Sequence, residues 1–276
     1  MSEQTGSGGL NEYIQHHLEQ NTIELVGGSF NIDTWAVSLA LGLIFIAWFG
    51  YFARKATSGV PSKGQAFVEI ILEFVDNQVK DNFHGDRSSL TPLALTIFMW
   101  VVLMNAMDLL PLDTPGMAVQ VVAGAEVASH TYFRWVPTAD LNTTVGISLV
   151  VFFLIFYHSI KAKGGFGFGK ELLTSPFHAE GKVTRAILLP VNLGMNVIEY
   201  AVKPVSLAMR LFGNMYGGEL VFMLIAGMLG GSLLMFVPGV LFNFAWAVFH
   251  VLIVLLQAFI FMILSVVYIA SAYESH

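Results

Sequence analysis

Arg210 lies in a run of mostly apolar and small residues, Lys203 to Glu219 (KPVSLAMRLFGNMYGGE), in a stretch apolar enough to lie in a membrane. A guanidinium in hydrocarbon costs roughly 3 kcal/mol on insertion scales and more than about 10 kcal/mol in simulations of an isolated helix. Arginine also keeps its proton, so it cannot act as a proton carrier. We therefore expect Arg210 to be a fixed positive charge that a negative group must meet.

Small and amide residues surround Arg210 on an ideal helix. A turn of about 100° per residue puts Ser206, Gly213, Asn214 and Gly217 within about 60° of it. Such a stripe lets another helix come close, and a partner helix could bring an anion to the arginine. The alternative is an ordinary packing seam, with Arg210 paired inside the same chain.

The last apolar segment carries His250 and Gln257, which share one helix face because they are seven residues apart. In an antiparallel hairpin of the last two helices, Arg210 would lie level with Gln257, and Glu219 level with His250. The midpoint of both pairs falls in the glycine-containing region Gly230–Gly239, where a turn is expected. Glu219 and His250 can exchange protons, whereas Arg210 cannot, so together they predict a proton path that stops at a fixed charge. A packing role is the alternative for His250.

Further polar residues lie near the ends of apolar segments. Asp108 precedes the sequence Leu-Leu-Pro, and Asp140 opens a later segment, either as a helix N-cap or as part of a proton path. Asn196 and Glu199 precede Arg210 in the chain. They line a second path to the inner water, or they merely occupy the membrane interface.

The elements that position these residues are membrane spans. Of 276 residues, 55% are hydrophobic and 12% are charged, against about 25% charged in soluble proteins. Five segments are apolar over the length that a span requires: about 35–53, 92–111, 144–160, 186–229 and 236–272. The last two exceed one perpendicular crossing, so we expect a tilted hairpin. Residues 64–83 predict an amphipathic helix in the membrane interface, and residues 10–21 a weaker one.

The predicted fold class is therefore an all-α polytopic membrane protein with five membrane-crossing helices and additional interfacial amphipathic helices. Lysine and arginine are frequent after the first and third spans, scarce in residues 112–141 and absent from the turn near 230–238. Because positive residues favour the cytoplasmic side, residues 1–34 are expected outside and the tail 273–276 inside. Residues 35–272 then form the integral membrane domain.

Several classes of function are excluded or disfavoured. The chain has no cysteine, so disulfides, thiolate metal sites and cysteine nucleophiles are excluded, and we expect no metal or cofactor. No basic run suggests nucleic acid, and no phosphate-binding P-loop motif occurs. A secondary transporter with an internal ion pair is disfavoured because no inverted repeat is evident. A purely structural scaffold is disfavoured by a charge inside a span.

Two runs closely resemble subunit a of the bacterial F-type ATP synthase membrane sector: Pro204 to Leu220 (PVSLAMRLFGNMYGGEL) and Trp246 to Phe261 (WAVFHVLIVLLQAFIF). The second span, Pro92 to Pro111, and the loop Lys55 to Pro61 (KATSGVP) are similar to the same family, as is Glu12 to Leu18 (EYIQHHL). The resemblance covers almost the whole chain.

This resemblance implies a non-enzymatic stator subunit in the bacterial cell inner membrane, with a periplasmic N-terminus and a cytoplasmic C-terminus. Its expected partners are a rotating ring of c subunits, the b-subunit peripheral stalk and membrane lipid. Protons would enter through an outer half-channel, protonate a carboxylate of the ring and leave through an inner half-channel. Arg210 would be the essential arginine between the two half-channels.

The resemblance also implies residue roles. Asn214, Glu219, His250 and Gln257 match positions near the arginine or the outer path, and Asp108 and Asp140 match acidic positions at the outer mouth. The family often has a glutamate where this chain has Asn196, and Glu199, about one helical turn on, is expected to replace it. The expected proton-path residues are thus Ser206, Asn214, Glu219, His250, Gln257, Asp108, Asp140, Asn196 and Glu199.

Overall fold

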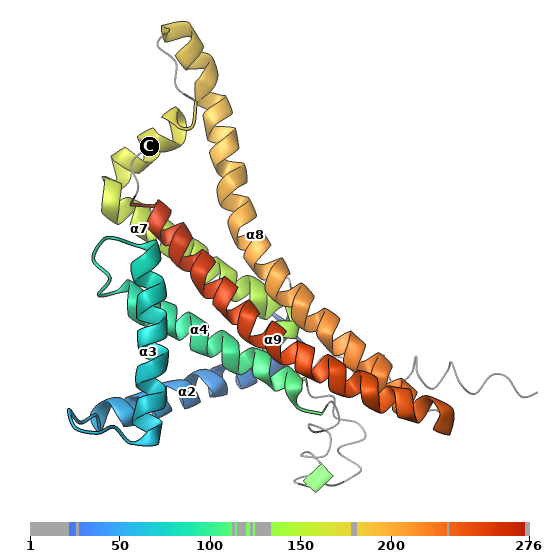
Figure 1. The fold of residues 1–276 in the computed structure, drawn as a ribbon. Coiled ribbons are helices and arrows are strands. Elements are labelled where there is room, and N and C mark those ends of the chain that lie inside the picture. The colour runs from blue at the N-terminus through green and yellow to red at the C-terminus, as the bar shows by residue number, and fades with distance from the viewer. Residues whose placement is uncertain are drawn as a thin grey trace, which may run out of the picture. The chain divides into compact units, whose positions relative to one another are not determined.

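The computed structural model describes residues 22–25, 28–111, 114, 120, 121, 124, 134–177, 181–230 and 232–273 (Figure 1). The weaker helix predicted for residues 10–21 lies outside them. The described elements are β1 (Thr22–Leu25), β2 (Gly28–Asn31), α2 (Ile32–Arg54), α3 (Lys63–Asn82), α4 (Leu90–Ala106), the 3-10 turns η1 (Met107–Leu109) and η2 (Pro137–Ala139), α7 (Leu141–Thr174), α8 (Lys182–Leu229) and α9 (Leu233–Ser271).

Five of these helices are long and apolar enough to cross a membrane. They are Ile32–Arg54, Leu90–Leu109, Leu141–Thr174, Val183–Leu229 and Leu234–Ser271. The predicted all-α polytopic fold class is confirmed. The described residues form two compact units, one from residues 1–55, 99–143 and 211–258, and one from residues 56–98, 144–210 and 259–276.

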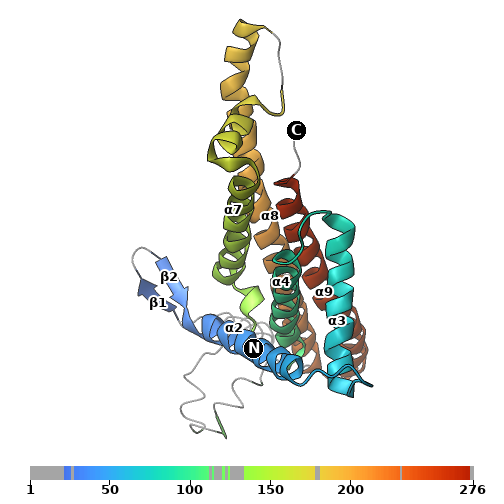
Figure 2. The same ribbon diagram turned by 90° about the vertical axis from the view of Figure 1, so that its left-hand side faces the viewer.

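The first unit begins with a short antiparallel hairpin that the sequence did not predict. β1 pairs with β2, with Thr22 opposite Asn31, and β2 leads directly into α2 (Figure 2). Each strand has four residues, which is too short for an alternating pattern to stand out. The hairpin fixes the start of α2, whose first turn carries two polar residues of the candidate site, Asp33 and Thr34.

α2 packs on the end of α4 through small residues. The Trp100 ring lies against Gly42, where an added Cβ would come within 3.2 Å of it. The Trp100 indole N–H donates to the carbonyl oxygen of Ser38 at 2.8 Å, and the Ser38 hydroxyl donates to the Met104 sulfur at 3.3 Å. A buried indole N–H needs such a partner, so these contacts fix α4 beside α2.

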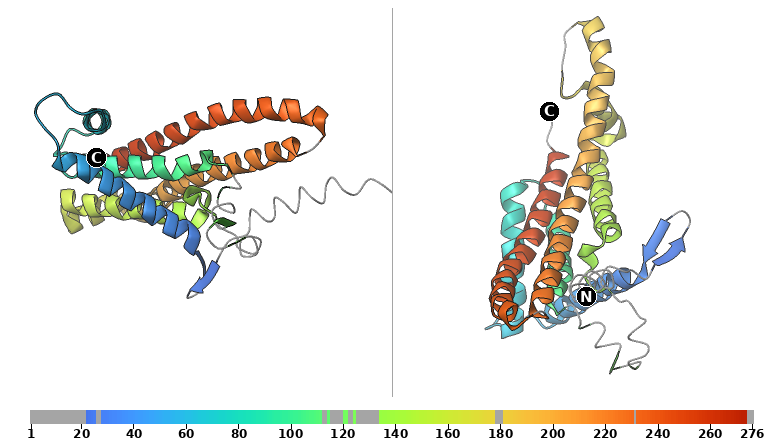
Figure 3. Two further views of the ribbon diagram at one scale, coloured as in Figure 1. Left: turned by 90° about the horizontal axis from the view of Figure 1, so that it is seen from below. Right: turned by 90° about the vertical axis from the view of Figure 1, so that its right-hand side faces the viewer.

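α8 and α9 form the antiparallel hairpin predicted from the sequence. Within the first unit they lie side by side up to the turn (Figure 3), and an added Cβ at Gly239 would lie 3.1 Å from the Leu229 side chain. Further along, the rings of Phe222 and Trp246 lie 6.3 Å apart. α8 has 48 residues, which at 1.5 Å each give about 72 Å, against a bilayer core of about 30 Å. Both helices are continuous, and their tilt in a membrane stays a prediction.

In the second unit, α7 continues well beyond the predicted span of 144–160. The backbone breaks at Gly164 (φ 73°, ψ 158°), and helix resumes as far as Thr174. Glycine adopts this positive φ without the penalty of a Cβ, which explains the break at this residue. The resumed helix brings the end of α7 to the first half of α8, which carries Asn196.

The predicted amphipathic helix is present as α3. The Ser62 hydroxyl caps it by accepting the Gln65 N–H at 3.3 Å, and Asp76 accepts a hydrogen bond from Thr91 at 2.9 Å. Its apolar face is partly buried and partly exposed: Val75 and Val79 are in the core, whereas Phe67, Ile70 and Phe74 are exposed. An exposed apolar face fits the predicted position in a membrane interface, which itself remains a prediction.

Candidate functional site

The first unit holds a completely buried acid–base pair. His250 Nε2 on α9 lies 2.7 Å from Asp108 Oδ2 in η1, and neither side chain is exposed. The rings of Phe222 and Trp246 lie on the imidazole at centroid distances of 5.2 and 6.0 Å. The structure thus joins two predicted site residues, because the 3-10 turn at the end of α4 carries Asp108 to α9.

A second buried ion pair joins Glu219 on α8 to Arg134, which precedes η2. Arg134 NH2 lies 2.5 Å from Glu219 Oε2, and the two side chains are 4% and 5% exposed. Glu219 and His250 were expected to act together as one proton-exchanging pair. In the structure Glu219 pairs with Arg134 and His250 with Asp108, and a shared proton-exchanging role for Glu219 and His250 stays a prediction.

The predicted match in depth between Glu219 and His250 agrees with the structure. Gly218 lies directly against the His250 ring, and an added Cβ would overlap His250 Cε1 and lie 2.9 Å from Nδ1. Glycine at 218 therefore makes room for the imidazole beside Asp108. Sequence reasoning missed this role of Gly218.

Asn214 and Gln257 are also brought together across the α8–α9 hairpin. The Asn214 amide donates to Gln257 Oε1 at 2.6 Å. Gln257 is buried, whereas Asn214 is exposed. Val254 lies one helical turn before Gln257 on α9. Its carbonyl oxygen accepts a hydrogen bond from the Asn105 side-chain amide at 3.4 Å, which ties α4 to α9.

Asp140 is the N-cap of α7. It accepts hydrogen bonds from the Asn142 N–H at 3.0 Å and from the Thr34 hydroxyl at 2.8 Å. The neighbouring Asp33 accepts from the Thr34 N–H and from the Arg134 N–H, both at 2.9 Å. The N-cap alternative for Asp140 is thus observed, and a place for it in a proton path stays a prediction.

In the second unit, Arg210 stands on α8 as a half-buried side chain. Within the part of the chain that the structure describes, it has no ion pair or hydrogen bond. Ser206, one turn earlier, is also half-buried. The alternative in which Arg210 pairs with an acid of its own chain finds no partner among the described residues.

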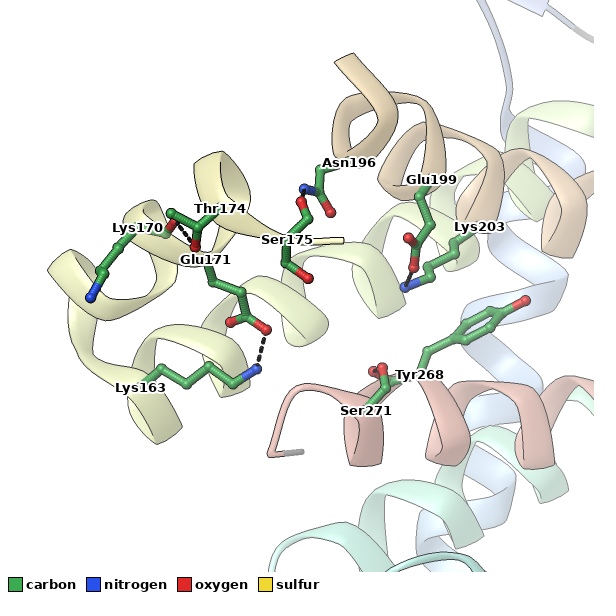
Figure 4. A network of polar contacts seen from close by, with 10 residues as sticks. All are labelled: Lys163, Lys170, Glu171, Thr174, Ser175, Asn196, Glu199, Lys203, Tyr268 and Ser271. Atoms are coloured by element: carbon green, nitrogen blue, oxygen red, sulfur yellow. Dashed lines mark hydrogen bonds and ion pairs between the residues drawn. The ribbon is translucent and has the colours of Figure 1, made fainter. Parts of the chain in front are cut away.

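Asn196 holds the end of α7 against α8. Its amide donates to the carbonyl oxygen of Ser175 at 2.7 Å (Figure 4) and to that of Leu172 at 3.0 Å. Asn192, one turn earlier, accepts from the Phe177 N–H at 3.1 Å and donates to the carbonyl oxygen of the same residue at 2.9 Å. These two amides satisfy backbone groups that the end of a helix leaves free. A proton-path role for Asn196 remains a prediction.

Glu199 forms an ion pair on its own helix. Its carboxylate lies 2.8 Å from Lys203 Nζ, and the Glu199 side chain is 62% exposed (Figure 4). The Lys203 ammonium also lies 4.8 Å from the centre of the Tyr200 ring and 5.5 Å from that of Tyr268. Glu199 is thus an accessible carboxylate on the part of α8 that precedes Arg210.

Sequence reasoning gave no functional role to Arg134. The sequence did mark Arg134, because it is the only lysine or arginine between positions 112 and 141. Among the described residues, no group of three or more histidines and acids is placed to hold a metal ion.

Five apolar helices with buried ion pairs between them define a polytopic membrane protein whose interior carries charge. The family model for the ATP synthase A chain matches residues 35–270. Proteins called ATP synthase subunit a in Pseudomonas syringae pv. tomato and Pseudomonas fluorescens are each 48% identical, and one in Pseudomonas aeruginosa is 45% identical, in each case over the full length of both chains. The chain belongs to this family, the subunit a of the membrane sector of F-type ATP synthases.

Proposed function

We propose that this chain is the proton-channel stator of an F-type ATP synthase, in which Arg210 separates an outer from an inner half-channel. The observation that best supports this proposal is which charged side chains have a partner of opposite charge within the chain. Glu219, Asp108 and Glu199 each have a cationic partner or a histidine within the chain. Arg210 has no such partner among the described residues, which supports a partner acid on another protein.

The position of Arg210 along α8 supports two separate paths. Helical rise puts Glu199 about 16 Å before Arg210 and Glu219 about 14 Å after it. Glu199 belongs to the proposed inner path, and Glu219 belongs with Asp108 and His250 to the proposed outer path. A fixed cation between them repels protons and so resists a leak that would join the two paths.

The surface after Arg210 supports close approach of a partner helix. At Gly213 and Gly217 an added Cβ would meet nothing within 4 Å, whereas Gly218 is filled by His250. Small exposed residues let helices approach closely in a membrane. The occupant we propose is the ring of c subunits, each with a membrane carboxylate, and the b-subunit stalk is the proposed second partner.

The fixed charge gives the proposed coupling its direction. A cation favours the ionised form of an approaching carboxylate and so promotes release of its proton to the inner path. Membrane potential adds about 2.3 kcal/mol per charge per 100 mV. The distribution of lysine and arginine supports a periplasmic N-terminus and a cytoplasmic C-terminus, which places the α8–α9 turn on the periplasmic side.

The test is Arg210→Ala, assayed for ATP-driven proton pumping in inner-membrane vesicles, with Met209→Ala as the control. Met209 is exposed on the preceding position of α8 and has no charge. We expect Arg210→Ala to abolish pumping while the complex still assembles, and Met209→Ala to pump normally. Robust coupled pumping by Arg210→Ala would overturn the proposal.

A further inference from the structure

The part of α7 that follows the break at Gly164 carries an exposed face that is both apolar and basic. Residues 141–163, before the break, rise about 35 Å at 1.5 Å per residue, which is close to the bilayer core of about 30 Å. The break therefore falls where a helix that crosses the membrane reaches its surface. Residues 165–174, here called the α7 extension, are then expected at the level of the lipid headgroups.

Several contacts fix one side of the α7 extension. The Phe168 side chain is buried, and its ring lies 6.0 Å from that of Tyr200 on α8. Across the break, Lys163 Nζ lies 2.7 Å from Glu171 Oε1 (Figure 4). The Asn196 amide of α8 donates to a carbonyl oxygen of the extension at 3.0 Å. The extension is thus a fixed helix with one packed side.

The opposite side of the α7 extension is exposed. At about 100° per residue, Lys170 and Leu173 lie within about 40° of Phe166, whereas Phe168 lies on the other side of the helix. Phe166 is 89% exposed, and Leu173 and Lys170 are also exposed. Figure 4 shows the Lys170 side chain pointing away from Asn196. A cation thus stands between two apolar side chains on one exposed face.

The charge of this region is positive. Residues 161–174 contain three lysines and one glutamate. Lys163 is held by its ion pair with Glu171, and Asp86 interacts electrostatically with Lys161. Lys170 has no ion-pair partner in the part of the chain that the structure describes. Its ammonium can therefore meet an anion from outside the chain.

We propose that the exposed face of the α7 extension binds an anionic phospholipid, with Lys170 at the headgroup and Phe166 and Leu173 beside the acyl chains. Amphipathic helices with basic and apolar side chains lie in the membrane interface, where a lysine stem lies along apolar surface while its ammonium reaches the headgroups. Basic residues next to a span attract anionic lipids. The lipid anchors the segment that packs on the half of α8 preceding Arg210. This proposal adds a lipid ligand and does not depend on the proton-channel role.

The experiment places photoreactive benzoyl-phenylalanine at position 166 in the assembled complex. The complex is reconstituted into vesicles of equal parts phosphatidylglycerol and phosphatidylethanolamine and irradiated, and the adducts are identified by mass spectrometry. The matched control is the same replacement at Phe153, which is 66% exposed on α7 before the break and should meet acyl chains whatever their headgroup. Lys170→Gln is compared with Lys80→Gln, which removes an exposed lysine from α3.

We expect the ratio of phosphatidylglycerol to phosphatidylethanolamine adducts to be about fivefold higher at position 166 than at position 153, which corresponds to the roughly 1 kcal/mol that one lysine gains near an anionic surface. Lys170→Gln should lower the ratio at position 166 to that at position 153, and Lys80→Gln should leave it unchanged.

Equal ratios at positions 166 and 153 in the otherwise unmodified chain would overturn the proposal. So would a ratio at position 166 that Lys170→Gln leaves unchanged, or one that Lys80→Gln lowers equally, because the preference would then not come from Lys170. Adducts at position 166 to another protein chain in place of lipid would show that a protein covers this face, and would overturn the proposal as well.

Discussion

Gly218 offers a sharp test of the buried acid–base pair, because a single methyl group at this position would collide with His250. The new Cβ would overlap Cε1 of the imidazole and lie 2.9 Å from Nδ1 and 3.2 Å from Nε2. The ring cannot easily retreat. It has no exposed surface, the Phe222 and Trp246 rings lie on it, and Asp108 holds its Nε2 at 2.7 Å.

The size of the effect follows from these contacts. Forcing an extra methyl into a packed interior typically costs about 1–3 kcal/mol, which lowers the population of the intact pair about 5- to 150-fold. If the ring is driven away from Asp108 altogether, the loss approaches the roughly 3–5 kcal/mol of a broken buried ion pair. We therefore expect Gly218→Ala to lower proton flux at least fivefold.

Gly194→Ala, also on α8, is the matched control for this prediction. An added Cβ at Gly194 meets nothing within 4 Å, and both variants gain the same roughly 1 kcal/mol of helix propensity. Proton flux through vesicles stripped of the soluble sector, scaled to the amount of assembled complex, is the measurement. Equal flux in Gly218→Ala and Gly194→Ala would refute the reasoning that His250 must stay beside Asp108.

Two further predictions concern the half of α8 that precedes Arg210. Asn196→Ala removes the amide that donates to the carbonyl oxygens of Ser175 and Leu172, and leaving these acceptors unpaired costs about 1–3 kcal/mol of stability. The backbone amides of residues 172–177 should therefore exchange hydrogen faster. An unchanged exchange rate would contradict the structural role of Asn196. Glu199→Gln should reduce passive proton flux if Glu199 belongs to the inner path, and flux equal to that of the unmodified protein would remove it from that path.

The hairpin of α8 and α9 was predictable because it depends on few features of the sequence. Two long apolar segments separated by glycines predict a pair of antiparallel helices. In such a hairpin the residue numbers of facing positions add up to a nearly constant value, which predicts which positions face each other. Asn214 beside Gln257 and Gly218 beside His250 follow this register. Helical spacing also predicted the stripe of small residues after Arg210, on which Gly213 is exposed and Gly217 half-buried.

The partners of the buried acids could not be predicted in this way. Arg134 reaches Glu219 from a segment 85 positions away in the chain, and no periodicity relates a loop residue to a helix. Asp108 reaches His250 because the helix tightens into a 3-10 turn at its end, which composition does not reveal. Matching Glu219 with His250 by depth alone therefore found the level in the hairpin, but it could not find Arg134 and Asp108 as their ion-pair partners.

The most direct test of the account asks whether the exposed stripe after Arg210 meets a ring subunit. The chain has no cysteine, so single cysteines can be placed without background at Gly213, which is exposed, and at Met215, which is fully buried. Each is combined with a cysteine beside the membrane carboxylate of the c subunit and oxidised mildly in the assembled complex. The account predicts a disulfide-linked product for Gly213→Cys and none for Met215→Cys. No product from Gly213→Cys, or equal products from both, would contradict it.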